Sequence, residues 1–175
     1  MLLLTNTYRI MEQMNIIFIH KGNSWYLPYA LNQVKKSNPN ANIILLGDES
    51  NNKYPFIKHF LISDYSKAAG SFSLIYKHFS TTNYQHELFC IQRWFIWLEF
   101  MQAHNLNSVM LPDTDVLIFQ DVTRYYENVE EDFHFTKGST GYMGFVYIKK
   151  QFYLNQICQF ITDQYSTASN LKKIR

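Results

Sequence analysis

Residues 15–20 carry the stretch that decides the fold, the almost unbroken apolar run Asn15-Ile16-Ile17-Phe18-Ile19-His20. It stops at Lys21-Gly22-Asn23, and a run without polar alternation predicts a strand that is covered on both faces. A second run over residues 42–46 is closed by Gly47-Asp48-Glu49-Ser50, and a shorter one covers residues 60–62. The sequence therefore predicts three strands, each followed by a polar turn.

A helix is predicted between the first two strands, with Asn23 or Ser24 as its cap. Its expected apolar positions are Trp25, Tyr29, Leu31 and Val34. Strand, helix and strand joined by short connections predict a parallel sheet with helices on its faces. In such a sheet, ligands bind at the carboxyl ends of the strands, so the turns after the strands are the places to look for a site.

The longest helix is predicted over residues 85–104, and it is apolar almost all the way round. A helix of this kind is buried in the middle of a protein. Its narrow polar seam consists of Gln85, Gln92 and Glu99, and Arg93 stands outside that seam. Later in the chain, a strand is predicted over residues 144–148 and an amphipathic helix over 153–165. With no linker visible, we expect one domain spanning residues 1–175.

The composition narrows the possible partners and the compartment. Hydrophobic residues make up 47% of the 175 residues and the formal net charge is only +2, so the chain offers no electrostatic footprint for nucleic acid. No apolar stretch approaches the ~18 residues of a transmembrane segment. Cys90 and Cys158 cannot form a disulfide framework, and we expect both to be reduced and buried. These features favour a soluble protein of the cytoplasm.

The segment most informative about chemistry is residues 109–119, which place Asp113 and Asp115 between two apolar runs. Pro112 cannot continue a central ladder, so the strand should end just before both carboxylates. We expect Val116 to Phe119 to return to the core. Two oxygen ligands on a rigid turn suit Mn²⁺ or Mg²⁺, and such an ion can hold a diphosphate and help it to leave.

The segment also allows two other interpretations. Asp113 and Asp115 could merely stabilise a turn through side-chain to backbone hydrogen bonds. A haloacid-dehalogenase-like phosphatase also places Asp-x-Asp after a buried strand, but it follows the second Asp with Gly-Thr, whereas Val116 and Leu117 stand here. Its motif also usually opens the chain. The phosphatase is therefore disfavoured, and the turn remains an alternative.

The order of these features resembles a GT-A-type glycosyltransferase that depends on a nucleotide sugar. The matching pieces are residues 17–22, residues 45–48, Arg93-Trp94, and the segment Met110-Leu111-Pro112-Asp113-Thr114-Asp115-Val116-Leu117. Members commonly have Leu-Asp-Ser-Asp-Val-Leu in this last segment, so Pro112 and Thr114 depart from the pattern. The resemblance covers about residues 15–150, the half that binds the nucleotide sugar. It implies an α/β fold with a Rossmann-like, mainly parallel twisted sheet flanked by helices, in which a C-terminal part of the family's domain could be lacking.

The resemblance also implies roles for individual residues. Asp115 would bind the metal directly, and Asp113 would reach the metal through water or hold the ribose or donor sugar. The remaining nucleotide-sugar contacts it implies are His20, Lys21 and Gly22 after the first strand, Asp48 after the second, and Arg93 near the diphosphate or donor sugar. Lys137-Gly138-Ser139-Thr140-Gly141 resembles the family's flexible segment facing the donor sugar.

Several of these residues could instead have purely structural roles. Arg93 could instead form a salt bridge with Asp113 or Glu99, because an unpaired buried guanidinium is costly. His20 could be an ordinary strand-end histidine, and Gly22 could serve only to supply a positive φ.

The expected activity is a metal-dependent transfer of a sugar from a nucleotide diphosphate sugar, with UDP favoured by the resemblance, to an unknown acceptor. The alternative is a non-catalytic domain, related to a truncated glycosyltransferase, that binds a nucleotide sugar or a partner. No residue is identified as the catalytic base.

Overall fold

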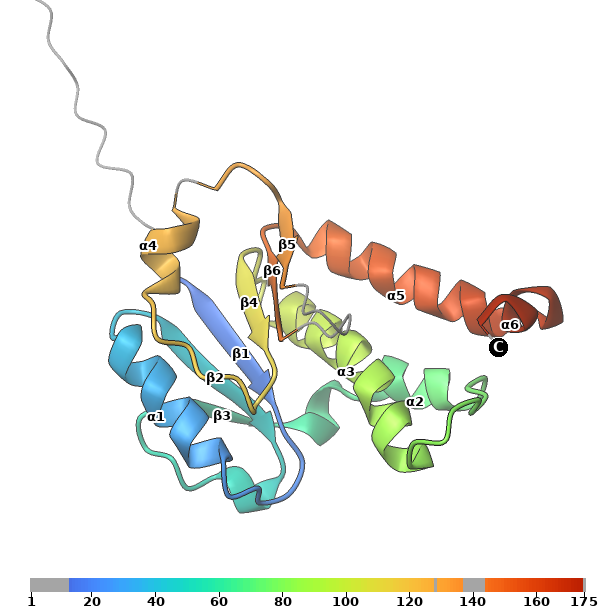
Figure 1. The fold of residues 1–175 in the computed structure, drawn as a ribbon, viewed down its shortest axis with the longest axis horizontal. Coiled ribbons are helices and arrows are strands. Elements are labelled where there is room, and N and C mark those ends of the chain that lie inside the picture. Colours follow the sequence, from blue (N-terminus) through green and yellow to red (C-terminus); the bar gives the residue numbers. More distant parts are fainter. Residues whose placement is uncertain (1–12, 128, 137–143, 175) are drawn as a thin grey trace, which may run out of the picture.

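The computed structural model describes residues 13–127, 129–136 and 144–174, and these contain a single six-stranded sheet with helices on both faces (Figure 1). The strands stand in the order β3-β2-β1-β4-β6-β5. Their bounds are β1 Asn15–Ile19, β2 Asn42–Gly47, β3 Lys58–Leu61, β4 Val109–Pro112, β5 Phe133–Phe135 and β6 Phe145–Ile148. The expected α/β fold is confirmed. The segment 137–141, compared above with a donor-facing loop, lies outside the described residues.

The sheet is parallel from β3 to β4, and β6 then pairs antiparallel with both β4 and β5. β1 is buried along its whole length, which explains why residues 15–19 show no polar alternation. The mainly parallel sheet is therefore also confirmed. The antiparallel direction of β6 adds a feature that the pattern of residues 144–148 did not specify.

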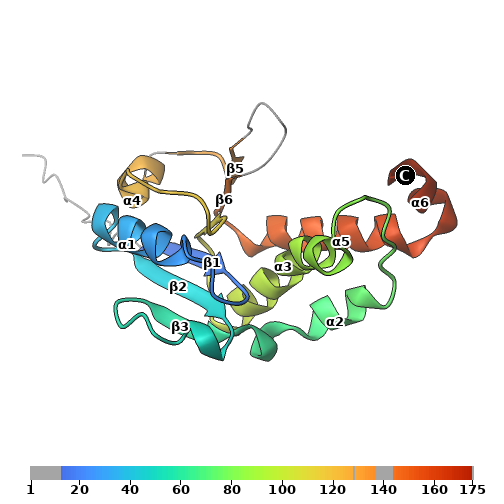
Figure 2. The ribbon, with the colours of Figure 1, turned by 60° about the horizontal axis from the view of Figure 1, so that its bottom comes forward.

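Two hydrophobic layers cover the sheet. The helices α1 (Leu27–Ser37) and α4 (Val122–Tyr126) pack with one set of alternate strand side chains, which includes Phe18 and Leu45. The helices α2 (Lys67–Ser73), α3 (Tyr84–Ala103) and α5 (Gln151–Ser166) pack with the opposite set, which includes Ile17 and Leu46. Figure 2 shows α1 and α4 on one side of the sheet and α3 on the other. The short helix α6 (Ala168–Ile174) follows α5.

The long helix α3 is confirmed within one residue of its predicted bounds. The side chain of Asn83 caps it by accepting hydrogen bonds from the amides of Gln85 and His86, and Trp97 at its middle is only 1% exposed. Its polar seam has a packing role. Gln92 donates to the carbonyl of Ala69 at 2.9 Å, and Glu99 accepts from two backbone amides at the start of α2. The seam therefore fastens α2 to α3.

Several local expectations were wrong. The third strand begins two residues earlier than predicted, because it pairs with β2 from Lys58 onward, and it ends at Leu61, where the chain enters a 3-10 turn. α1 begins at Leu27, later than expected, and no side chain caps it. Trp25 and Tyr29 are exposed and do not belong to its buried face, which consists of Leu27, Ala30, Leu31 and Val34.

The segment after the acidic pair returns to the core only in part. Ile118 is buried, but Leu117 and Phe119 on either side of it are exposed. Val116 is partly buried and packs against the same cluster as Ile118, and Ser37 and Gln33 of α1 donate hydrogen bonds to the Ile118 carbonyl, so these contacts hold the segment against α1. The two cysteines also differ, since Cys158 is buried as expected while Cys90 is half-buried.

Candidate functional site

The carboxyl ends of β1, β2 and β4 lie at one rim of the sheet, because these strands are parallel. The strand order reverses beside β1: the chain moves outward from β1 to β2 and β3, and then returns to the other side of β1 as β4. A reversal of this kind opens a crevice outside the strand ends, where open α/β sheets bind their ligands. The turns that follow β1 and β4 border this point (Figure 1).

Asp113 follows β4 directly, since the strand ends at Pro112 as the missing proline donor predicts. The amide of Asp113 donates to the carbonyl of Gly144 at 2.9 Å, and its carbonyl accepts from the amide of Val116 at 3.2 Å. The Asp113 side chain is partly buried, whereas Asp115 is exposed. The turn is therefore fixed by its backbone, and the Asp115 carboxylate remains open to solvent.

Arg93 forms an ion pair with the carboxylate of Asp113. Of the two alternative partners considered from the sequence, Asp113 is the one used, because Glu99 is engaged with the start of α2. Burial raises the pKa of Asp113, and the Arg93 guanidinium opposes that rise. The guanidinium also lies 5.3 Å from the ring centre of Trp97, which anchors it to the core.

His20 connects the end of β1 to the acidic pair. Its Nδ1 lies 3.1 Å from the hydroxyl of Thr114, the residue between the two aspartates. His20 is buried, and this burial lowers its pKa despite the nearby carboxylate of Asp48. Its other ring nitrogen, Nε2, is buried without a hydrogen-bond partner among the described residues. Thr114 was regarded in the sequence only as a departure from the family pattern, yet it supplies this contact.

Asp48 and Gly22 join the turns after β2 and β1. The Gly22 amide donates to Asp48 Oδ2 at 2.6 Å, and Asp48 Oδ1 accepts from the amide and the hydroxyl of Ser50. The pKa of Asp48 is lowered chiefly by the Ser50 hydroxyl and then by the Gly22 amide. Gly22 has φ of +77°, the conformation that favours glycine. Both residues therefore have a structural role in shaping this rim.

Asn51 completes this junction. Its side-chain oxygen accepts from the amide of Asp48 at 3.1 Å, and its side-chain amide donates to the carbonyl of Gly22 at 2.8 Å. The sequence reasoning missed Asn51, although a signal existed: an Asp followed three residues later by a second polar side chain is the spacing of a capping box.

Lys21 extends from the β1 turn toward α3. Its ammonium group lies 4.2 Å from the ring centre of Phe89, one helical turn before Arg93. Partial burial lowers the pKa of Lys21, although Asp48 acts in the opposite direction. Two cations from different elements, Lys21 and Arg93, thus reach the rim, as an anionic ligand would require.

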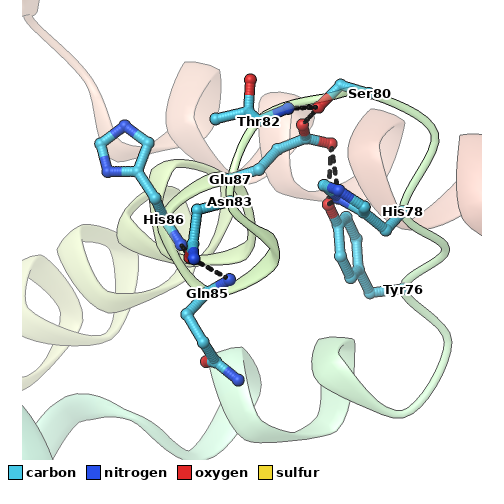
Figure 3. A network of polar contacts seen from close by, with 8 residues as sticks. All are labelled: Tyr76, His78, Ser80, Thr82, Asn83, Gln85, His86 and Glu87. Carbon is cyan, nitrogen blue, oxygen red and sulfur yellow. Dashed lines mark hydrogen bonds and ion pairs between the residues drawn. The ribbon is translucent and has the colours of Figure 1, made fainter.

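The start of α3, which precedes Phe89 and Arg93, is held by a polar network around Glu87 (Figure 3). The hydroxyl of Tyr76 donates to Glu87 Oε1 at 2.7 Å, the hydroxyl of Ser80 donates to Oε2, and His78 Nδ1 lies 3.6 Å from Oε1. These bonds lower the pKa of Glu87. The carboxylate therefore ties the loop before α3 to the first turn of the helix.

Asp113 and Asp115 can supply only some of the ligands that a divalent cation requires. No group of three or more His, Cys, Asp or Glu side chains gathers at one point in residues 13–127, 129–136 and 144–174. Mg²⁺ and related ions are often held by one or two carboxylates, with the substrate's phosphates and water completing the shell. Asp115, with Asp113 beside it, fits this arrangement.

Neither a protein-family model nor a curated protein matches the chain. Among solved structures, it is similar to two crystal structures of the glycosyltransferase GlyE from Streptococcus pneumoniae TIGR4. The first has a TM-score of 0.52 at 16% identity, over 90% of this chain and 39% of that chain. The second, the apo form, has a TM-score of 0.50 at 16% identity, over 87% of this chain and 38% of that chain.

At this level of identity, the likeness concerns the fold alone. The chain shares the α/β fold of part of a glycosyltransferase, and it spans about two fifths of the length of these structures. In the described part of the chain, none of the helices combines the length and the apolar character needed to cross a membrane.

Proposed function

We propose that this chain binds a nucleotide diphosphate sugar together with a divalent cation and takes part in transferring the sugar to an acceptor. One observation carries the proposal. Asp113 and Asp115 follow β4 at the point where the strand order reverses, and Thr114 between them contacts His20 at the end of β1. A crevice at such a reversal is where phosphate-bearing ligands bind in α/β sheets.

Each residue of the rim has a distinct role in this proposal. Asp115, exposed and without an ion pair among the described residues, provides a carboxylate for Mn²⁺ or Mg²⁺. Such an ion, when bound, offsets the negative charge that develops on the departing nucleoside diphosphate. Arg93 can exchange its bond to Asp113 for one to a phosphate, because a guanidinium binds carboxylate and phosphate oxygens in the same bidentate geometry. It can also donate to the hydroxyl groups of the donor sugar.

Lys21 adds a second positive charge beside the same rim, and the shared turn of Gly22 and Asp48 orients it. We propose Lys21, Gly22, His20 and Asp48 as the side of the site that receives the nucleotide. UDP is the favoured nucleoside diphosphate through the resemblance to GT-A-type enzymes. No residue is assigned as a catalytic base.

Titration calorimetry with UDP, with and without Mn²⁺, tests the proposal. We expect the chain to bind UDP in a Mn²⁺-dependent manner and the Asp115→Ala variant to lose this binding. Because Asp115 is exposed, the free energy of unfolding of the Asp115→Ala variant should differ from that of the native chain by no more than about 0.5 kcal/mol. Asp163→Ala is the matched control, since Asp163 is exposed on α5.

The same sample should then be given UDP-glucose, UDP-galactose and UDP-N-acetylglucosamine, and donor hydrolysis followed by the release of UDP. Release supports an enzyme, and binding without release supports the non-catalytic alternative. If neither UDP nor GDP binds with Mn²⁺, or if Asp115→Ala and Asp163→Ala behave alike, the proposal is wrong.

A further inference from the structure

A hollow of about 490 Å³ lies on the outer surface of α1, on the side away from the sheet. Its described lining residues are Trp25, Pro28, Tyr29, Asn32, Gln33 and Lys36. None of these belongs to the buried face of α1, so packing of the helix against the sheet does not account for them. The volume lies in the range of sites for small molecules.

The aromatic part of the hollow is open to solvent. Trp25 is 80% exposed and Tyr29 is 64% exposed. The centres of their rings lie 6.2 Å apart, with an angle of 70° between the ring planes. The two rings therefore form a corner with two apolar walls. Exposed aromatic rings that lie side by side form an apolar surface of the kind that marks an interaction site.

The rest of the lining is polar. Asn32 donates its side-chain amide to the carbonyl of Pro28 at 2.7 Å, and Gln33 donates to the carbonyl of Ile118 at 3.4 Å. Their side-chain oxygens accept no hydrogen bond from the described residues. Lys36 likewise makes no ion pair with any residue in the described part of the chain, and it supplies the one charge of the lining.

We propose that this hollow is a saccharide-binding site. A sugar ring has a face of C–H groups that can pack on an indole or phenol ring, and an edge of hydroxyl groups that needs donors and acceptors. The Trp25–Tyr29 corner offers the first surface, and Asn32, Gln33 and Lys36 offer the second. A purely apolar ligand would leave these polar groups without partners. A nucleic acid is disfavoured because basic residues do not alternate with the rings.

The hollow adjoins the candidate donor site. The ring of His20 lies 6.0 Å from that of Tyr26, and Tyr26 lies 5.8 Å from Trp25. A continuous row of ring contacts thus runs from the end of β1 to the hollow. If the proposed function is correct, a saccharide bound here is the acceptor or an extension of it. That role rests on the proposed function, whereas saccharide binding itself does not.

The test is calorimetric titration and saturation-transfer NMR with a defined panel of saccharides. The panel contains maltose, cellobiose, lactose, chitobiose, mannobiose and, to probe Lys36, sialyllactose. Fluorescence gives a third signal, because Trp25 is exposed while Trp94 and Trp97 are 9% and 1% exposed. We expect at least one saccharide to bind and to reduce the quenching of Trp25 by acrylamide.

The variants Trp25→Ala and Tyr29→Ala should each weaken this binding at least tenfold. Phe160→Ala is the matched control, since Phe160 is a 63% exposed ring on α5. Trp25→Ala should keep Mn²⁺-dependent UDP binding, and Asp115→Ala should keep saccharide binding. The two proposals therefore fail independently of each other.

Three results would overturn the saccharide site. The first is that no member of the panel binds, and the second is that Trp25→Ala binds as tightly as Phe160→Ala. The third is that Trp25 becomes protected from acrylamide as the protein concentration rises, without any saccharide, which would identify a second copy of the chain as the occupant. Loss of UDP binding in Trp25→Ala, with no saccharide bound by the native chain, would assign the rings to the nucleotide.

Discussion

The guanidinium of Arg93 lies against the carboxylate of Asp113, and this contact joins the buried helix α3 to the end of β4. Both side chains remain partly accessible, with 22% and 30% of their surfaces exposed. The pair therefore has a structural role in the free protein and is also within reach of a ligand. A phosphate arriving at the rim would compete with Asp113 for the same guanidinium.

Replacing Arg93 by Met should destabilise the fold and weaken nucleotide binding. The variant leaves Asp113 half-buried without its partner, and we expect a loss of about 1–2 kcal/mol in the free energy of unfolding. This loss is smaller than for a fully buried pair, because solvent screens the partly exposed charges. Urea denaturation measures this loss, and calorimetry should show Mn²⁺–UDP binding at least tenfold weaker. Arg93→Lys keeps the positive charge but cannot form two parallel hydrogen bonds to a phosphate. It should therefore retain more of the native stability than of the native nucleotide binding. Equal losses in both variants would contradict this assignment.

Trp97→Ala should cost about 3–5 kcal/mol of stability, because it removes a fully buried ring from the centre of α3. The ring contacts Trp94 edge-on at 5.5 Å and lies beneath the Arg93 guanidinium. Trp97→Phe retains most of the apolar volume and should therefore be clearly more stable than Trp97→Ala. Chemical denaturation of both variants provides the measurement. A fully stable Trp97→Ala protein would show that the ring is not part of the core.

Glu87 should make the fold sensitive to acid. Its pKa is lowered in the folded chain, chiefly by the Ser80 hydroxyl and then by Tyr76, relative to its ordinary value of 4.5. The unfolded chain therefore binds a proton more readily, so this contribution to stability is complete above about pH 4.5 and is lost as the pH falls through the lower folded value. In Glu87→Gln, stability should depend less steeply on pH in that range, as measured by thermal unfolding at pH 3 to 7. Glu127→Gln removes an equal charge outside the network and should keep the slope of the native chain.

Two glycine-to-alanine changes should have opposite effects. Neither added Cβ would meet an atom within 4 Å, so the backbone conformation decides the outcome. Gly22 has φ of +77°, and Gly22→Ala should lose about 1–2 kcal/mol. Gly70 lies within helix α2, where Gly70→Ala should gain about 0.5–1 kcal/mol. Midpoints of urea denaturation compare the two, and a stabilising Gly22→Ala would show that the turn does not require glycine.

Much of the fold was accessible from the sequence because β1 and β2 are buried along almost their whole length and α3 is buried over residues 94–98. β1, β2 and α3 lack a polar face, so their composition alone separates them from the surrounding turns. Trp25 and Tyr29 misled the prediction for α1, because Trp25 precedes the helix and Tyr29 lies on its exposed side, whereas an aromatic ring on a helix usually faces the core. The direction of β6 is set by its pairing with β4, which no local pattern encodes.

The candidate site was accessible only in outline. Local spacing predicts that Asp113 and Asp115 follow a strand, and the strand order then brings them beside His20. The partners of these residues are long-range contacts: Thr114 with His20, Phe89 with Lys21, and Asp48 with Gly22. Such contacts depend on how distant segments pack, so the sequence could offer Arg93 two carboxylates but could not choose between them.

The position of β1 in the sheet also affects how the chain folds during translation. β1 and β2 are close in sequence and can pair early, but the other edge of β1 waits for β4, which is synthesised only after the whole of α3. During translation, a strand that is buried along its whole length in the finished fold thus has an unpaired edge, the type of surface that chaperones bind and that promotes aggregation. Because β4 pairs with β1 late, the nascent chain would be more prone to aggregation than the finished fold.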